Sequence, residues 1–195
     1  MKLRVDAYLT SIDDLDFRLI RALGYRLILC DVDNSLQEHG LHGISPEAAL
    51  HFRAMHAAGL GMAVLTNARE ERAGAMAKAI QDALPGLRIP VYAMAKKPSR
   101  KRVLEACRDA GTAPAETLLF GDQYFTDALA GLRAGLGATV LLKPISGREP
   151  WYIRLKRLGE RLLLPILGIR LHDNRIRALP GCSLLPGTHR ESGLE

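Results

Sequence analysis

Short runs of hydrophobic residues alternate along the chain with longer segments in which hydrophobic positions recur at helical spacing. An uninterrupted apolar run of four or five residues is typical of a strand buried on both faces, and a recurrence every three or four residues is typical of an amphipathic helix. The alternation predicts an α/β protein with a doubly wound parallel sheet of about five strands. The predicted strands are residues 27–30, 62–65, 89–92, 118–120 and 139–142.

Cap residues and stop residues mark the helices between these strands. Ser45 followed by Pro46 predicts the start of a helix that ends near Gly59, because serine caps helix ends and proline fits the first turn. Further helices are predicted over 68–84, 99–111 and 126–133. A chain of 195 residues suits one well-buried domain, which we expect over 1–178. It includes a basic helical segment over 148–177, and 179–195 is predicted to be a flexible tail.

Polar residues stand just after the predicted strands, where the carboxyl ends of parallel strands meet. Open α/β sheets bind their ligands at this edge, so we expect these side chains to converge on one cleft. They are Asp31, Asp33, Thr66, Asn67, Lys96, Lys97, Asp122 and Asp127.

Asp31 and Asp33 are separated by one residue, so in extended chain both side chains point the same way. One carboxylate can attack a substrate while the other transfers a proton. A carboxylate attacks a phosphate dianion only if a cation offsets the repulsion, so the site requires a metal. Asp122 and Asp127 offer the hard oxygen ligands that Mg²⁺ prefers, and we expect Lys97, with Lys96 as the alternative, to neutralise charge. The Thr66 hydroxyl and free backbone N–H groups of the Thr66–Asn67 turn would bind phosphoryl oxygens.

These segments resemble, in order, the four motifs of the haloacid dehalogenase superfamily, and most closely its YqeG-type class III phosphatases. The motifs are Asp31-Val32-Asp33-Asn34-Ser35, Thr66-Asn67, Lys97-Pro98 and Gly121-Asp122-Gln123-Tyr124-Phe125-Thr126-Asp127. The likeness extends from about residue 11 to 144 and implies a phosphomonoesterase that forms an aspartyl-phosphate.

The resemblance also implies a role for each matching residue. Asp31 would be the nucleophile and Asp33 the acid and base. Mg²⁺ would be held by the Asp31 side chain, the Asp33 carbonyl and Asp122, with Thr66 and Lys97 on the phosphate. Ser35 replaces a usual threonine but keeps the hydroxyl. Three roles remain open for Asp127: metal ligand, partner of the lysine, or acid at a helix N-terminus.

The sequence gives weaker support for a site built on cysteine or histidine than for the aspartate site. Cys30, Cys107 and Cys182 lack the paired spacing of a disulfide framework or a zinc site. A cysteine phosphatase would need an arginine six residues after Cys30, where Leu36 stands. The histidines, also without a ligand pattern, are interpreted as surface or packing residues. They include His39, His42, His51 and His56.

Positive charge is concentrated near the C-terminus. The chain carries a net charge of +6, and between Arg148 and Arg177 eight basic residues outnumber three acidic ones.

The intervals between motifs leave no room for a large cap domain, so an open site is expected. Basic amphipathic helices bind anionic membranes, although such a stripe more often packs on its own domain. The apolar positions are Trp151, Tyr152, Leu155, Leu158 and Leu162, and the basic positions on another face are Arg154, Arg157 and Arg161.

These features support a cytoplasmic enzyme, with peripheral contact to the inner face of a membrane as a hypothesis. No apolar run reaches the ~18 residues of a membrane span, and the N-terminus does not read as a secretory signal. The resemblance favours phosphatidylglycerophosphate as substrate. Two alternatives stay open: a phosphatase of soluble sugar or nucleotide phosphates, and a non-catalytic module whose basic segment binds RNA or protein. Nucleic acid is the less favoured partner, and the oligomeric state stays undetermined.

Overall fold

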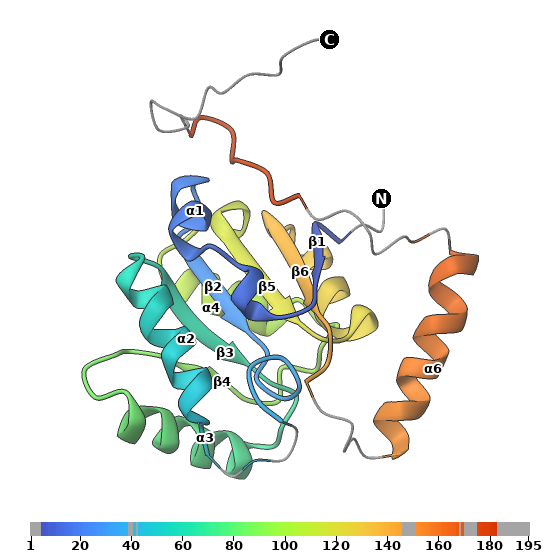
Figure 1. The fold of residues 1–195 in the computed structure, drawn as a ribbon, viewed down its shortest axis with the longest axis horizontal. Coiled ribbons are helices and arrows are strands. Elements are labelled where there is room, and N and C mark those ends of the chain that lie inside the picture. Colours follow the sequence, from blue (N-terminus) through green and yellow to red (C-terminus); the bar gives the residue numbers. More distant parts are fainter. Residues whose placement is uncertain are drawn as a thin grey trace.

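A computed structural model describes residues 5–38, 41, 43–145, 151–167, 169 and 175–182, with backbone alone for 151–154 and 156. In this part of the chain, six parallel strands form one sheet in the order β1-β6-β5-β2-β3-β4 (Figure 1). The strands are β1 (Ala7–Leu9), β2 (Leu27–Cys30), β3 (Gly61–Leu65), β4 (Val91–Tyr92), β5 (Thr117–Gly121) and β6 (Ala138–Leu142). The predicted doubly wound sheet is confirmed.

The sheet has one strand more than the five predicted. The additional strand, β1, has three residues and pairs along the edge with β6. A run this short is no clear strand signal, because its pairing depends on a partner more than a hundred residues away.

Helices cover both faces of the sheet. They are α1 (Phe17–Ala22), α2 (Pro46–Ala57), α3 (Glu70–Ala83), α4 (Lys101–Asp109), α5 (Leu129–Ala134) and α6 (Trp151–Ile166). Shorter turns are η1 (Ile12–Asp14), η2 (Pro114–Glu116) and the π-helical turn η3 (Tyr124–Ala128). Ser45 caps α2 by accepting from the Ala48 N–H, as predicted. The expected single helix over 126–133 is divided between η3 and α5.

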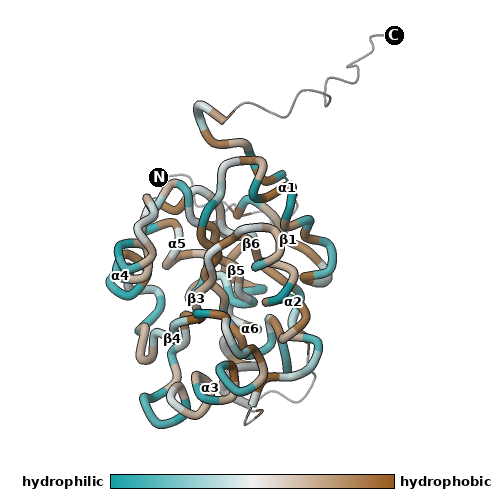
Figure 2. Tube along the Cα trace, turned by 90° about the vertical axis from the view of Figure 1, so that its left-hand side faces the viewer, coloured by the Kyte–Doolittle hydropathy of each residue, from teal (hydrophilic) through white to brown (hydrophobic). Residues whose placement is uncertain are grey.

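The alternation of side chains along the strands builds two hydrophobic layers. Ile28 and Cys30 of β2 pack on the side of α1, α2 and α3, whereas Leu27 and Leu29 pack on the side of α4. Because both faces are covered, the strands are apolar throughout. Figure 2 shows these hydrophobic strands inside the molecule and hydrophilic stretches of α3 and α4 at its periphery.

Helix α6 lies beside the β1–β6 edge of the sheet, apart from α2 and α3 (Figure 1). Its Leu164 is buried in a small cluster with Tyr124, Leu141 and Ile169. Among the residues that the structure describes, no helix is both long and apolar enough to cross a bilayer.

The strand order places the predicted cleft at the middle of the sheet. β2 pairs with β3 on one side and with β5 on the other, so the chain changes direction of winding between β2 and β5. The described residues between Asp31 and Thr66 include α2, and those between Thr66 and Lys97 include α3. Neither interval holds a large cap. The predicted tail over 179–195 lies mostly outside the described residues.

Candidate active site

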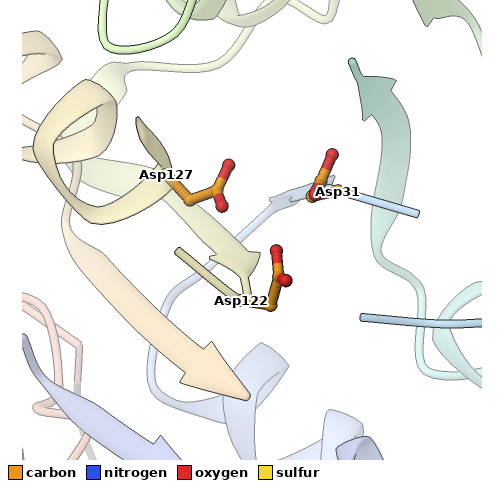
Figure 3. A group of neighbouring side chains, drawn as sticks. All are labelled: Asp31, Asp122 and Asp127. Carbon is orange, nitrogen blue, oxygen red and sulfur yellow. The ribbon is translucent and has the colours of Figure 1, made fainter. Parts of the chain in front are cut away.

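Two neighbouring strands deliver the central carboxylates. Cys30 of β2 is level with Phe120 of β5, so Asp31 and Asp122 emerge next to each other at the carboxyl edge. Asp127 reaches the same place from η3. Carboxylate oxygens of Asp31, Asp122 and Asp127 lie within 4.8 Å of one another, and all three residues are buried. Figure 3 shows the three carboxylates directed toward a common space.

Lys97 neutralises part of this charge. Its Nζ lies 2.8 Å from Asp31 Oδ1 and 2.6 Å from Asp127 Oδ1, and its side chain is only 3% exposed. Lys96, in contrast, is exposed. The structure therefore brings Lys97, and not Lys96, to the carboxylates.

Burial and ion pairing shift the pKa values of Asp31 and Lys97 in opposite directions. Burial raises the pKa of Asp31 well above its usual value, although the Lys97 ammonium acts to lower it. Burial disfavours the charge on Lys97, but the carboxylates of Asp127 and Asp31 outweigh this effect and raise its pKa. Burial also raises the pKa of Asp122 to about 6. An excess of buried negative charge is the electrostatic setting in which a cation is bound.

Asp127 is held at several points. Besides its contact with Lys97, its Oδ2 accepts from the Gln123 N–H at 3.1 Å and from the Thr126 hydroxyl at 3.2 Å. Gly121 provides the space, because a Cβ at that residue would lie 2.3 Å from Asp127 Cγ. Of the three roles left open for Asp127, this geometry favours partner of the lysine.

Asp33 lies at the rim of the site. Its Oδ1 accepts from Arg72 Nη2 of α3 at 2.6 Å, and its side chain is 15% exposed. The chain turns sharply beyond it, where Asn34 adopts a left-handed conformation (φ 62°). Ser35 is buried, and its hydroxyl has no hydrogen-bond partner among the described residues.

The second motif is arranged differently from the prediction. The Thr66 N–H donates to the Tyr92 carbonyl at 3.1 Å, and the Ala68 N–H donates to the Thr66 hydroxyl oxygen at 3.1 Å. The expectation of free N–H groups here is wrong for Thr66, because its N–H completes the pairing of β3 with β4. The Asn67 side chain binds the backbone of Lys97, accepting from its N–H at 2.7 Å and donating to its carbonyl at 3.3 Å. Asn67 thus joins the second and third motifs.

The sequence reasoning missed two arginines. Arg72 follows Asn67 by five residues on a helix and carries no motif signal. Arg157 was expected only as one basic position of the C-terminal helical segment, with no role at the site. In the structure its Nη2 pairs with Asp122 Oδ2 and its Nη1 donates to the Asp122 carbonyl at 3.2 Å. An isolated arginine in a basic helix gives no sequence signal of such a contact.

Among the residues that the structure describes, no cysteine or histidine belongs to the carboxylate cluster. Cys30 is buried, and burial together with the neighbouring Asp31 raises the pKa of its thiol well above the usual value, which keeps it protonated and unreactive. His51 lies 3.7 Å from Asp13. His39 and His42 fall outside the described residues.

Comparisons with known proteins support the family resemblance. A family model of haloacid dehalogenase-like hydrolases matches residues 14–135. The chain is 26% identical over 167 residues to the probable phosphatase YqeG of Bacillus subtilis (strain 168), covering 86% of this chain and 92% of that protein.

Two solved structures are also similar. The cobalt-bound deoxy-D-mannose-octulosonate 8-phosphate phosphatase YrbI from Haemophilus influenzae aligns with a TM-score of 0.48 at 15% identity, over 76% of this chain and 92% of that one. NagD from E. coli K-12 aligns with a TM-score of 0.45 at 16% identity, over 63% of this chain and 90% of that one. On the evidence of the family model, which covers more than half of its length and includes the aspartates at the ends of β2 and β5, the chain belongs to the haloacid dehalogenase-like hydrolase family.

Proposed function

We propose that this hydrolase is a magnesium-dependent phosphomonoesterase in which Asp31 attacks phosphorus and Asp33 transfers the proton. The observation that carries the proposal is the cluster of Asp31, Asp122 and Asp127 at the carboxyl end of the sheet, in which Asp31 and Asp127 pair with the Lys97 ammonium. Lys97 and Arg157 together offset two of these three buried negative charges. One is left over, which is costly for a purely structural site because buried charge is unfavourable unless it is neutralised.

The residues present fit a hard divalent cation. Asp122 Oδ1 is buried and has no hydrogen-bond partner among the described residues, which is a costly condition for a carboxylate oxygen unless an ion satisfies it. Asp31, the Asp33 carbonyl and Asp122 would hold Mg²⁺, because carboxylate and carbonyl oxygens are its preferred ligands. When bound, Mg²⁺ would offset the repulsion between the Asp31 carboxylate and the phosphate and polarise the phosphoryl group.

The chain's own residues then account for the reaction. An Asp31 oxygen forms a bond to phosphorus as the bond to the substrate oxygen breaks, and Asp33 donates a proton to that leaving oxygen. Asp33 then takes a proton from water, whose oxygen attacks the aspartyl-phosphate and releases inorganic phosphate. The Thr66 hydroxyl and Lys97 stabilise the phosphoryl oxygens, with Asn67 holding the Lys97 backbone in place.

Removal of the metal tests this proposal directly. Chelation of the purified enzyme is expected to stop hydrolysis of p-nitrophenyl phosphate, and Mg²⁺ is expected to restore it, because Asp31 alone cannot approach a dianion. Release of inorganic phosphate measures the turnover. Restoration by Zn²⁺ but not by Mg²⁺ would contradict the proposed oxygen site.

A site without a cap domain suits a phosphate group that projects from a large molecule or from a membrane surface. A cavity of about 470 Å³ beside the second motif combines charged and apolar lining, and includes Asn67, Arg72, Leu41 and Met76. It could take the polar headgroup that carries the terminal phosphate of a phospholipid, and we favour phosphatidylglycerophosphate as the substrate. A soluble sugar or nucleotide phosphate is the alternative.

Helix α6 supports the lipid substrate because its apolar face points to solvent. Leu155, Leu158, Leu162 and Ile166 recur at helical spacing and are between 53% and 78% exposed. Arg157, Glu160 and Leu164 lie on the opposite face and contact the body of the protein. The three leucines of the predicted apolar stripe are therefore not packed on their own domain, and the side chains of Trp151 and Tyr152 lie outside the described part of the chain. An outward apolar face on a basic helix is suited to an anionic bilayer, at the inner surface of the membrane in a cytoplasmic enzyme.

Loss of leucines from this face should weaken membrane association. Replacing Leu158 and Leu162 by serine is expected to reduce binding to anionic vesicles at least ~10-fold, since each buried leucine contributes ~1.5 kcal/mol or more. Sedimentation with vesicles measures the binding. L50S is the matched control, because Leu50 is 64% exposed on α2.

Turnover distinguishes the two substrate classes. The double variant should lose activity on vesicle-borne phosphatidylglycerophosphate while retaining it on p-nitrophenyl phosphate. If wild-type protein ignores vesicles and hydrolyses sugar or nucleotide phosphates instead, the lipid substrate is wrong and the soluble alternative stands.

A further inference from the structure

Among the described side chains of α6, Arg157 contacts the proposed metal-ligand set. Arg157 is only 15% exposed, and the Asp122 side chain that it contacts is fully buried. One guanidinium nitrogen pairs with Asp122 Oδ2, while the other donates to the Asp122 carbonyl at 3.2 Å. A planar guanidinium that engages two acceptors of one residue fixes that residue's orientation better than a single donor could.

This contact leaves the two oxygens of Asp122 in different situations. Oδ2 is tied to Arg157, and Oδ1 is buried without a hydrogen-bond partner among the described residues. A carboxylate that binds a metal through one oxygen is commonly held by a hydrogen bond to the other. The division of the Asp122 oxygens matches that pattern, with Oδ1 left for the cation.

The position of Arg157 depends on how α6 is docked. Glu160, three residues further along the helix, accepts from the Phe125 N–H at 2.8 Å. Leu164, a further turn along, packs against Tyr124 and Leu141. These contacts lie on the same face of α6 as Arg157, and they attach the helix to the segment that follows Asp122.

We infer that Arg157 is a positioning residue of the cation site, through which α6 orients Asp122 and raises the affinity for the metal. The inference rests on the proposed function, because it assumes that Asp122 binds Mg²⁺. In this inference Arg157 acts on the site through its contact with Asp122 and not on the reacting atoms themselves. Since the apolar face of α6 points the other way, the helix can orient Asp122 and contact a surface at the same time.

Calorimetric titration of substrate-free protein with Mg²⁺ tests this inference without an activity assay. R157Q is expected to weaken Mg²⁺ binding by ~10- to 100-fold, the usual effect of removing a partner of a metal ligand. R157K should lie between R157Q and wild type, because lysine restores the charge but not the two-point contact. R161Q is the matched control, since Arg161 is exposed on the same helix and should bind Mg²⁺ like wild type.

Each other outcome overturns the inference. Tighter Mg²⁺ binding by R157Q would make Arg157 a competitor of the cation. Unchanged affinity in R157Q and R157K, with a lower melting temperature, would make the contact only an anchor for α6. Titrations are run at temperatures where circular dichroism shows each variant folded, so a loss of affinity is not a loss of structure.

The wild-type titration separates the inference from the proposed function. If wild type binds no Mg²⁺, the proposed function fails and the inference falls with it. If wild type binds Mg²⁺ and R157Q binds it with the same affinity, the inference alone is rejected.

Discussion

Substitution of Asp31 by asparagine is expected to reduce turnover by roughly 10⁴-fold or more, the scale on which loss of a nucleophile acts. Asparagine keeps the shape of the side chain but removes the attacking charge. Initial rates of phosphate release from p-nitrophenyl phosphate at saturating Mg²⁺ measure the effect. The variant should fold, because Lys97 retains its contact with Asp127 at 2.6 Å.

D82N is the matched control for this variant. Asp82 is an exposed aspartate of α3, so the same change there should leave turnover close to wild type. Acid-quenched reactions with labelled substrate should trap an acid-stable, alkali-labile phosphoryl group on wild-type protein and none on D31N. If D31N turns over like wild type, Asp31 is not the nucleophile and the proposed mechanism is wrong.

The sequence predicted the central sheet because its signals are local. Four apolar runs, beginning with Leu27 and ending with Leu142, became β2, β3, β5 and β6 within a residue or two. The weaker run at 89–92 shortened to Val91–Tyr92. Burial on both faces requires continuous hydrophobicity, and that requirement is visible without any knowledge of partners. β1 was missed because its strand character comes from its pairing with β6.

The choice between Lys96 and Lys97 shows that a family motif can locate a site residue that residue type alone cannot identify. Composition does not distinguish Lys96 from Lys97, and the likeness of Lys97-Pro98 to a family motif supports the preference for the second. In the structure the two differ completely in exposure. The roles of these side chains are still proposals, but their convergence on one edge of the sheet is what the strand-end argument predicts.

Contacts between distant segments were beyond the sequence argument. The Arg157–Asp122 pair spans 35 residues and depends on the docking of α6, which is set by Glu160 and Leu164. The hydrophobic pattern of α6 indicated a helix but not which face would turn inward. Amphipathic helices ordinarily bury their apolar face. Here the described contacts of the helix with the sheet domain combine two charged residues, Arg157 and Glu160, with Leu164. The leucines of the predicted stripe stay exposed, an arrangement that the pattern alone argues against.

The last prediction concerns Lys97, for which the chain supplies its own control. K97M is expected to destabilise the protein by ~3–5 kcal/mol, the usual cost of leaving buried charge without its partner. Methionine fills similar volume, so the loss is mainly electrostatic: Asp31 and Asp127 would face each other with no cation between them. Urea unfolding in the absence of Mg²⁺ measures the change. K96M, one residue earlier and exposed, should alter stability by less than ~0.5 kcal/mol.

Activity should separate the two lysine variants as clearly as stability does. Without the Lys97 ammonium, Mg²⁺ alone would offset the charge of Asp31 and the incoming phosphate dianion, and Asp127 would lose its partner. Turnover of K97M should therefore fall by ~10²- to 10³-fold, comparable to loss of a key electrostatic donor. K96M should remain close to wild type. Mg²⁺ should raise the unfolding free energy of K97M more than that of wild type, because the ion supplies positive charge that the variant lacks. Equal stability and equal turnover in K97M and K96M would mean that Lys97 neutralises nothing of consequence, and the electrostatic argument for the site would fail.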